Sequence, residues 1–418
     1  MRYQFFIYVF LLFGSMEALE RITLWRKPVP KSQEILKNII KFAKSNNTNQ
    51  QQRVEIDLFN FQNVQYYGTV YVGSGKSPFQ VLFDTGSDIF WIPGKDVHGT
   101  CGVSHNKYDC STSSSCTLLK KDDEINYLKG STKYHLAKDT LTIGDVSIKQ
   151  MEVGLVYEGD CEGSQFDGII GMSLQMREDY QPMFRRMIDQ HLVSHKVFSF
   201  RLNNKDTGMS GGELFLGGWD PVYSEEDFKY IPVNSEHTGF WSVAMNRVNF
   251  GSAVIAGLGH AIFDTGTSLI ITSYSVANKI AIQINAIISQ DIMFVECSRM
   301  KDVPSLVFSI HGTDYFLTAD ELLFMEMDGL CVLGLGASSQ LQDNEWLLGD
   351  VFLSRFYSVH DYQNRRIALI RLNGTSPTAE PHSTTTPRRN GSSTMSFSIC
   401  SIFSLSFMVL YLYIFNYR

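Results

Sequence analysis

The sequence has little positive charge and little proline, and these shortages exclude whole classes of protein. Its 36 Lys and Arg residues are outnumbered by 43 Asp and Glu residues, which gives a formal net charge of −7. An acidic chain is poorly suited to nucleic acid as its main partner. With 11 prolines in 418 residues and 44% hydrophobic residues, the composition is that of a folded protein rather than a disordered one. A chain of this length predicts at least two lobes.

Apolar runs at the two ends of the chain are typical of a protein that enters the secretory pathway. Residues 1–18 combine a basic start, an apolar run at 5–13 and a small final residue, Ala18, which predicts a cleaved signal peptide. Residues 373–395 are rich in Ser, Thr and Pro and predict a stalk. Residues 396–418 contain an apolar run long enough to cross a bilayer, which predicts either a membrane span or a glycolipid-anchor signal that is removed.

Cysteine is scarce as well, and its placement suits an oxidising compartment. Cys400 lies in the apolar tail, which leaves six cysteines in the body: Cys101, Cys110, Cys116, Cys161, Cys297 and Cys331. The four in the first half allow three pairings, among which the sequence does not choose. Candidate glycosylation sites agree with secretion and lie at Asn46, Asn373 and Asn390.

Positive charge is concentrated in one short segment. Residues 19–53 carry eight Lys and Arg residues against two Glu residues, a net charge of +6, which leaves −13 on residues 54–418. Opposite charges attract, and this attraction weakens as carboxylates become protonated. The segment therefore either docks on the acidic body in a pH-dependent way or is a solvated basic stretch without a partner.

The body of the chain consists of short apolar runs separated by glycines. Runs rich in Val, Ile, Phe and Tyr predict strands, among them 67–72, 80–83, 140–143, 198–202 and 213–216. Helical stretches are few, among them 181–190 and 275–288. This pattern predicts a mostly β protein of many short strands.

One motif occurs twice, as Asp-Thr-Gly-Ser at 84–87 and Asp-Thr-Gly-Thr at 264–267. Each copy follows an apolar run and is followed downstream by two apolar residues and a glycine. Ile169 lies 85 positions after the first aspartate, and Leu347 lies 83 positions after the second. Matched spacing of this kind predicts a duplicated lobe. The two predicted lobes are residues 54–235 and 236–372.

Two carboxylates held face to face have a characteristic chemistry. They do not both ionise readily, so the pair shares one proton. The ionised partner can take a proton from water while the protonated one polarises a carbonyl. A single Asp-Thr-Gly is most often a surface turn, but the matched pair favours Asp84 and Asp264 as a catalytic dyad. Gly86 and Gly266 would permit close turns, and the motif hydroxyls would orient the carboxylates: Thr85, Ser87, Thr265 and Thr267.

Over residues 21–372 the chain resembles the pepsin and cathepsin D family of aspartic endopeptidases. The first motif continues in the family pattern through Trp91, the second through Leu269, and the last strands read Trp-Leu-Leu-Gly-Asp-Val-Phe at 346–352. The resemblance implies an all-β, bilobal, pepsin-like acid protease fold with the active-site cleft between two similar lobes. It also implies hydrolysis of peptide bonds by a water activated between Asp84 and Asp264, with no need for a metal or an organic cofactor.

The resemblance also implies roles for residues around the dyad. Tyr127 matches the tyrosine of the β-hairpin flap that closes over bound peptide, Ser131 belongs to the same flap, and Trp91 would hydrogen-bond to the flap tyrosine. Cys297 and Cys331 match a family disulfide. Residues 19–53 resemble the activation propeptide, which occupies the cleft of the zymogen and is released in acid.

The sequence departs from the family pattern at three places. In the flap, Leu128 and Lys129 replace the usual Gly and Thr, and Lys129 either favours acidic substrate side chains or points into solvent. Asp88 replaces the usual second serine and adds a carboxylate that either shifts the pKa of the dyad or faces away from it. Cys101 lacks the close partner that the family has before it.

Together these features predict a monomeric, acid-active, cathepsin D-like endopeptidase made as a secreted zymogen. Its partners would be protein and peptide substrates, its own propeptide, and a membrane reached through the C-terminal tail or a lipid anchor. We expect it in the secretory pathway, and then in an endolysosomal compartment, outside the cell or tethered at the cell surface. Two alternatives stay open: a membrane-tethered processing protease of narrow specificity, and an inactive homologue that binds peptides.

Overall fold

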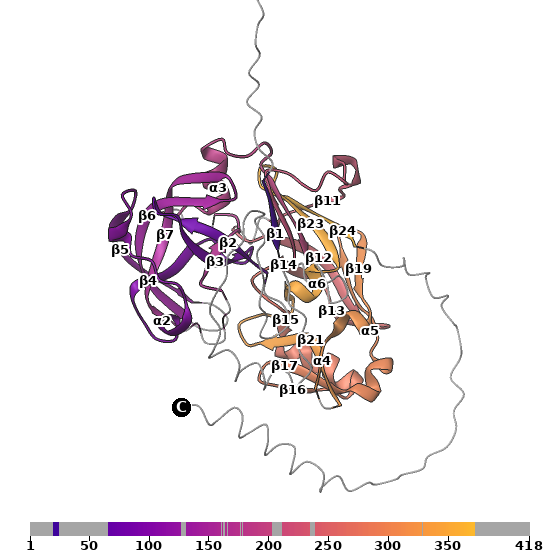
Figure 1. The fold of residues 1–418 in the computed structure, drawn as a ribbon. Helices are drawn as coiled ribbons and strands as arrows, with labels where there is room; N and C mark the ends of the chain where they lie inside the picture. The colour runs from indigo at the N-terminus through magenta and orange to yellow at the C-terminus, as the bar shows by residue number, and fades with distance from the viewer. Residues whose placement is uncertain are drawn as a thin grey trace, which may run out of the picture. The chain divides into compact units, whose positions relative to one another are not determined.

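The computed structural model describes most of the body of the chain (Figure 1). The described residues are 20–24, 66–126, 131–159, 161, 164, 166–175, 177, 179–202, 211–234, 239–327 and 329–372. The predicted signal peptide, stalk and tail lie outside them, as do most of the basic segment and the sequons at Asn46, Asn373 and Asn390. The described chain is folded mainly into strands that form three sheets. The prediction of an all-β fold is therefore confirmed.

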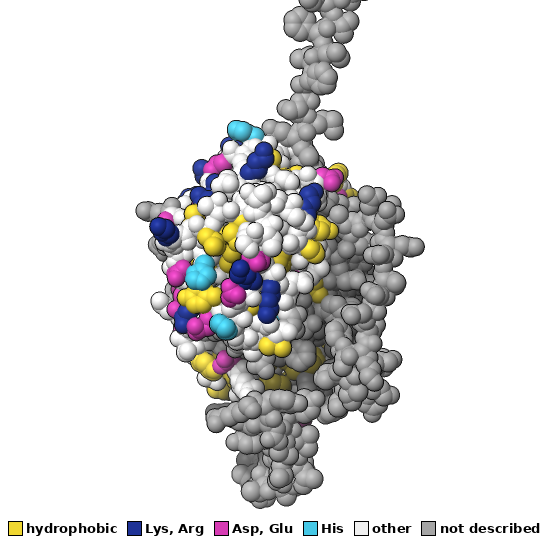
Figure 2. All heavy atoms as spheres, turned by 60° about the vertical axis from the view of Figure 1, so that its left-hand side comes forward, with side chains coloured by type: hydrophobic (Ala, Val, Ile, Leu, Met, Phe, Trp, Pro, Cys, Tyr) yellow, Lys and Arg dark blue, Asp and Glu magenta, His cyan; other side chains and the backbone are white. Residues whose placement is uncertain are grey.

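The first sheet has seven strands and is built from the first half of the chain. In spatial order they are β2 (Tyr67–Val72), β3 (Ser77–Asp84), β8 (Gly168–Gly171), β4 (Phe90–His98), β7 (Val146–Gly159), β6 (Ser131–Ile143) and β5 (Thr117–Asn126). An additional pairing of β2 with β6 folds the sheet back on itself. Figure 2 shows the outer face on this side, where Lys and Arg side chains stand among Asp and Glu side chains instead of gathering into a basic patch.

The second sheet has eleven strands and is built from the second half. Its main path runs β16 (Ile287–Ser289), β17 (Ile292–Glu296), β21 (Leu330–Ser338), β15 (Ile270–Ser273), β22 (Glu345–Leu348), β14 (Gly259–Phe263), β12 (Ser242–Phe250), β18 (Leu306–Ile310) and β19 (Thr313–Leu317). Off this path, β13 (Ala253–Ala256) pairs with β12, and β20 (Leu323–Met327) pairs with β21.

The third sheet joins strands from both halves. Its six strands are β1 (Glu20–Leu24), β10 (Gly212–Leu216), β9 (Val197–Leu202), β23 (Phe356–Asp361), β24 (Arg366–Arg371) and β11 (Tyr230–Pro232). Strand β9 pairs antiparallel with β23, so backbone hydrogen bonds link the two halves directly. The predicted lobe boundary after residue 235 falls among residues that the structure does not describe, and it stays a prediction.

The repeat in the sequence corresponds to a repeat in the fold. Strand β3 leads to the first motif and pairs in parallel with β8, so that Asp84 lies opposite Gly171. Strand β14 leads to the second motif and pairs in parallel with β22, so that Phe263 lies opposite Leu348. Each motif thus follows a strand whose parallel neighbour is the downstream apolar run. In each half a similar length of chain separates the motif from the apolar run that pairs beside it, and this explains the similar intervals in the sequence.

Helices are short in the part of the chain that the structure describes. The α-helices are α2 (Cys101–Ser104), α3 (Met183–Asp189), α4 (Tyr274–Ile284), α5 (Ala319–Leu322) and α6 (Asp350–Leu353), and the 3-10 helices are η2 (Cys110–Thr112), η3 (Glu225–Asp227) and η4 (Cys297–Asp302). Helix α3 confirms the helix predicted at 181–190. The extension of the second predicted helix to residue 288 is wrong, because Asn285 adopts a left-handed conformation with φ 54° and ends α4.

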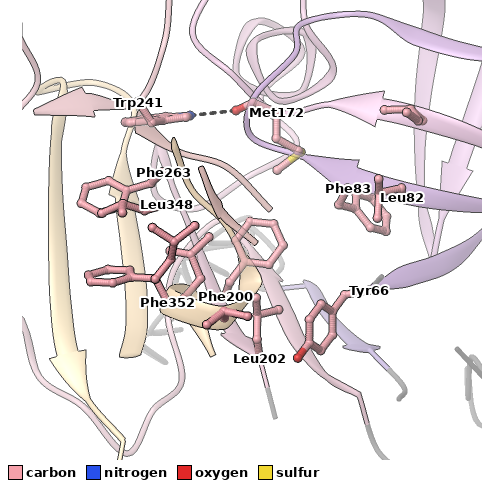
Figure 3. Close-up of a cluster of buried hydrophobic side chains, with 14 of the residues drawn as sticks. Tyr66, Leu82, Phe83, Met172, Phe200, Leu202, Trp241, Phe263, Leu348 and Phe352 are labelled. Carbon is pink, nitrogen blue, oxygen red and sulfur yellow. Dashed lines mark hydrogen bonds between the residues drawn. The ribbon is translucent and has the colours of Figure 1, made fainter. Parts of the chain in front are cut away.

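A buried hydrophobic cluster connects the first half of the chain to the second (Figure 3). Trp241 is fully buried, and its indole N–H donates to the carbonyl oxygen of Met172 at 2.9 Å. Phe83 and Phe263, which directly precede the two motif aspartates, are buried in the same cluster. Burial of these large side chains stabilises the strand ends from which the motif turns emerge.

The third sheet buries a histidine among aromatic rings. His360 on β23 is fully inaccessible. Its ring stacks on that of Phe198 with the ring centres 4.7 Å apart, and it lies nearly perpendicular to the ring of Trp241 with the ring centres 4.8 Å apart. Its Nε2 lies 3.3 Å from the hydroxyl of Ser358. Burial lowers the pKa of His360 from 6.5 to about 3, because the charged imidazolium is poorly solvated among aromatic rings.

We expect His360→Phe to stabilise the protein in acid. The folded state loses stability as the pH falls from the ordinary histidine pKa of 6.5 towards 3, because the unfolded chain binds a proton that the folded chain excludes. At pH 4.5 this amounts to at most about 3 kcal/mol. The thermal midpoint of the variant should exceed that of the wild type increasingly below pH 6.5. The control is His195→Phe, because His195 is exposed. A difference in thermal midpoint between H360F and the wild type that does not vary with pH would contradict the prediction.

Candidate active site

The two motif aspartates lie at the ends of buried strands, one in each of the first two sheets. Asp84 is the last residue of β3, and Asp264 directly follows β14. Both residues are almost inaccessible, with 4% of Asp84 and 7% of Asp264 exposed. The structure therefore places two carboxyl groups, which are 180 residues apart in the sequence, at the junction of the two halves.

Each carboxylate accepts two hydrogen bonds from its own motif. In both motifs the glycine N–H donates to Oδ1 of the aspartate at 2.8 Å. The hydroxyl of the next residue donates to Oδ2: Ser87 donates to Asp84, and Thr267 donates to Asp264 at 2.6 Å. Because the same pairs of atoms are used on both sides, the two carboxylates are held in matching orientations.

The motif threonines connect the two motifs to each other. The N–H of Thr85 donates to Oγ1 of Thr265 at 3.0 Å, and the N–H of Thr265 donates to Oγ1 of Thr85 at 3.0 Å. Their hydroxyls donate onward across the junction, Thr85 to the carbonyl of Phe263 at 2.8 Å and Thr265 to that of Phe83 at 2.6 Å. The expectation that these two hydroxyls orient the carboxylates is wrong, because both are used in holding the motifs together.

The motif glycines leave room for the carboxylate of the opposite half. A Cβ atom added at Gly266 would lie 2.3 Å from Oδ1 of Asp84, and one added at Gly86 would lie 2.5 Å from Oδ1 of Asp264. No side-chain carbon fits at such distances. Glycine is therefore required at both positions because the backbone of each motif lies close to the carboxylate of the other motif. In this arrangement the two carboxylates face each other.

Burial and the second carboxylate change the acidity of the pair. Loss of solvation on burial raises the pKa of Asp84 well above its usual range, and the charge of Asp264 and a hydrogen bond with Asp264 raise it further. The hydrogen bonds from Ser87 and Gly86 act in the opposite direction, because they stabilise the ionised form. A proton is therefore retained on the pair at a pH where an isolated aspartic acid has already lost it.

The third carboxylate, Asp88, is turned to a partner outside the motifs. Only 2% of Asp88 is exposed, and its Oδ1 accepts a hydrogen bond from the guanidinium of Arg177 at 2.7 Å. Among the described residues no hydrogen bond joins Asp88 to either dyad aspartate, and the two alternatives left by the sequence stay predictions. Arg177 was not predicted from the sequence, because it belongs to no motif and reaches Asp88 only through the fold.

The flap region is described on both sides of its tip. Strands β5 and β6 form the hairpin, and Asn126 pairs with Ser131, the first residue of β6. Tyr127, the predicted flap tyrosine, lies outside the described residues, as do Leu128 and Lys129. Trp91 lies on β4, is 3% exposed, and has its Cβ 3.3 Å from where a Cβ of Gly154 would stand. The predicted contact between Trp91 and Tyr127 stays a prediction.

Three disulfides close the body of the chain, pairing Cys101 with Cys161, Cys110 with Cys116, and Cys297 with Cys331. The last is the pair that the family resemblance implies. In the first half the structure selects one of the three possible pairings. Cys101, at the start of α2, is joined to Cys161, two residues after the end of β7, in place of a partner nearby in the sequence.

With this geometry established, comparison with known proteins identifies the family. Residues 65–372 match the model of the eukaryotic aspartyl protease family. The chain is 32% identical over 329 residues to cathepsin D of Clupea harengus, a match covering 75% of this chain and 83% of that protein. It is 32% identical over 322 residues to chymosin of Camelus dromedarius, covering 75% of this chain and 82% of that protein. It is 31% identical over 327 residues to pepsin A of Gallus gallus, covering 75% of this chain and 86% of that protein.

The chain belongs to the eukaryotic aspartyl protease family. It is an aspartic endopeptidase, and its substrates are proteins and peptides. Within the described ranges, no helix combines the length and the apolar character that a membrane crossing requires. The predicted membrane tail, residues 396–418, lies outside those ranges.

We expect Gly266→Ala to abolish most of the activity while leaving the protein folded. The added methyl group would displace Asp84 from the position that it shares with Asp264, and a displacement of about 1 Å in a catalytic group can lower turnover about 100-fold. The measurement is kcat/KM on a denatured protein substrate, with circular dichroism to check the fold. Gly257→Ala is the matched control, because nothing lies within 4 Å of its Cβ position. Turnover near that of the wild type in G266A would contradict the close-approach argument.

Proposed function

We propose that Asp84 and Asp264 are the catalytic dyad of this endopeptidase and that the enzyme works in acid. The observation that carries the proposal is the pairing of two buried carboxylates with matching hydrogen bonds across the junction of the two halves. The geometry also argues against a homologue that binds peptides without cutting them, because both carboxylates and both supporting hydroxyls are present in equivalent positions.

The chemistry follows from one proton shared by the pair. The ionised carboxylate takes a proton from a water molecule as the water oxygen attacks the carbonyl carbon of the peptide bond, and the protonated carboxylate gives its proton to the carbonyl oxygen. When the tetrahedral intermediate collapses, the C–N bond breaks, the leaving amine accepts a proton from the protonated carboxyl group, and a hydroxyl of the intermediate returns its proton to the ionised carboxylate as the new carbonyl forms. The products are a carboxylic acid and an amine, and the pair again holds one proton.

The raised pKa of Asp84 supports activity at pH values above the usual aspartic acid pKa. The range of activity ends at the pH where the pair loses its shared proton. Burial and Asp264 raise the pKa of Asp84, so the pair keeps its proton as the pH rises through the ordinary aspartate range. Once that proton is lost, nothing polarises the substrate carbonyl. Activity should therefore decline on the alkaline side of an acidic optimum.

We propose further that residues 19–53 act as an activation propeptide. Strand β1 lies within this segment and pairs with β10 from Glu20 opposite Leu216 to Leu24 opposite Gly212, at the edge of the third sheet. The segment carries +6 against −13 on the rest of the chain, and acid weakens that attraction by protonating carboxylates. A chain held inactive at neutral pH and released in acid fits both features.

We also propose that the protein is a secreted, monomeric enzyme tethered at a membrane, in an endolysosomal compartment or at the cell surface. Three disulfides support an oxidising compartment. The signal peptide at 1–18, the stalk at 373–395 and the tail or anchor signal at 396–418 rest on the sequence. The lobe bounds, 54–235 and 236–372, likewise remain proposals. So do the roles of Tyr127 and Ser131 in the flap and of Trp91 as the hydrogen-bond partner of Tyr127.

Replacing either dyad aspartate with asparagine should abolish hydrolysis without unfolding the protein. Asparagine has the size of aspartate but neither accepts a proton from water nor donates one to the carbonyl, so we expect Asp84→Asn and Asp264→Asn each to lower kcat by more than about 1,000-fold. The assay is globin cleavage from pH 3 to 7, with and without pepstatin, a general inhibitor of this family. Retention on immobilised pepstatin shows that the cleft is folded, and near-normal cleavage by either variant would refute the assignment.

Neutralising the basic segment should move activation to higher pH. We expect the triple variant Lys37→Gln, Lys41→Gln, Lys44→Gln to begin cleaving substrate at a higher pH than the wild type, because the attraction that acid must overcome is weaker. The matched control replaces three exposed lysines of the body with Gln: Lys149, Lys229 and Lys301. If both triple variants share the wild-type pH of onset, the charge of the segment does not hold the zymogen closed.

A further inference from the structure

One arginine contacts three separate segments around the dyad. The guanidinium of Arg177 donates to Oδ1 of Asp88 at 2.7 Å and to the hydroxyl oxygen of Tyr134 at 3.3 Å, and it lies 3.6 Å from Oδ2 of Asp123. Its plane also lies near the ring of Tyr180, 5.6 Å from the ring centre. The Arg177 side chain is 29% exposed, so the ion pair is largely removed from water. We call these contacts of Arg177 with Asp88, Asp123 and Tyr134 the Arg177 junction.

On one side, the Arg177 junction reaches the loop that carries the first aspartate. Asp88 is four residues after Asp84, and the intervening backbone is fixed by the segment that follows β8. The N–H of Met172 donates to the carbonyl of Asp84 at 2.7 Å, and the N–H of Ser173 donates to that of Ser87 at 3.0 Å. The position of Asp88 is thus rigidly related to the position of the dyad.

On the other side, the Arg177 junction holds the base of the flap hairpin. Asp123 on β5 and Tyr134 on β6 are direct cross-strand partners, three residue pairs before Asn126 opposite Ser131. Three residues of strand extend about 10 Å, so the junction contacts the hairpin about 10 Å from the pair Asn126 and Ser131. Tyr134 is 1% exposed, and its ring lies 2.7 Å from the Cβ position of Gly154, which fixes the ring against β7.

The chemistry of the junction suits arginine in particular. A guanidinium presents several N–H donors in one plane and can serve two acceptors at once, whereas an ammonium group is a single compact charge. Burial disfavours the charge on Arg177, but the hydrogen bond and charge of Asp88 outweigh this and raise the pKa of the guanidinium. Burial also raises the pKa of Tyr134, so its hydroxyl stays protonated and can accept from Arg177 while it donates towards Asp123.

We propose that Arg177 is a positioning residue that fixes the flap hairpin relative to the loop of Asp84. This rests on the proposed function, because a flap matters only where a peptide is bound and cut. With the junction intact, the described base of the hairpin stands at a set distance from the dyad. Without it, the hairpin keeps its strand pairing but loses the connection that fixes its base relative to the loop of Asp84.

The first variant removes the guanidinium but keeps an unbranched apolar side chain. In the purified full-length protein, kept in mild detergent, we expect Arg177→Met to raise KM for a peptide substrate about tenfold, the size of effect that one charge-assisted hydrogen bond supports. The value of kcat should change much less, because neither aspartate moves. The same variant leaves Asp88 buried without its partner, so a lower thermal midpoint is also expected.

A double variant separates positioning from simple stability. Asp88→Ser combined with Arg177→Gln removes the buried carboxylate together with its partner and restores the serine usual at that position in the family. We expect its thermal midpoint to return towards the wild type while KM stays raised about tenfold. A KM that recovers along with the thermal midpoint would show that Arg177 only neutralises Asp88, and the proposal would be overturned.

Two single variants complete the test. Tyr134→Phe removes only the flap-side hydroxyl and should raise KM severalfold with the Asp88 pair intact; an unchanged KM would contradict the proposal. Lys133→Met removes an exposed ion pair with Glu158, one residue pair nearer the tip, and should leave KM unaltered. Binding of pepstatin is measured for every variant as a readout independent of turnover. If the wild type binds pepstatin but cuts nothing, the proposed function fails, and the affinity series still tests the junction.

Discussion

The reciprocal hydrogen bonds between Thr85 and Thr265 are the constraint on which the rest of the site depends. Two buried carboxylates repel each other when both are ionised, and each prefers water to the protein interior. They stay together because the backbones that carry them are joined by hydrogen bonds that run in both directions. Each threonine hydroxyl is satisfied by a carbonyl of the opposite half, so no buried polar group is left over in the connection.

This connection explains why both motifs require their other residues. Because the two backbones are held together, the distance between the carboxylates is fixed. Gly86 and Gly266 have no side chain, and they leave the space that the carboxylate of the opposite motif occupies. The hydroxyls of Ser87 and Thr267 then determine how each carboxylate is turned. The raised pKa of Asp84 follows from the same geometry, since burial and proximity to Asp264 both disfavour its charge.

Much of the fold and site could be predicted from the sequence because the relevant signals are local. Val, Ile, Phe and Tyr runs predicted strands such as β2, and the repeated motif predicted two equivalent aspartates. Of the two failures, one depends on a contact between distant segments and the other on a local turn. Thr85 was assigned to its own carboxylate because its true partner, Thr265, is 180 residues away. The end of α4 was misplaced because the left-handed turn at Asn285 interrupts an otherwise apolar run.

The matching of the two sides has a consequence for substrate direction. A polypeptide has an amino end and a carboxyl end, but the glycine N–H and hydroxyl donors around Asp84 and Asp264 are the same on both sides. The hydrogen bonds that orient the two carboxylates therefore do not distinguish the two ends of a bound chain. The choice falls to parts of the molecule outside the dyad, among them the β5–β6 hairpin, which belongs to the first half alone. Variation in that hairpin can change which bond is placed over the carboxylates while the bond-breaking chemistry stays the same.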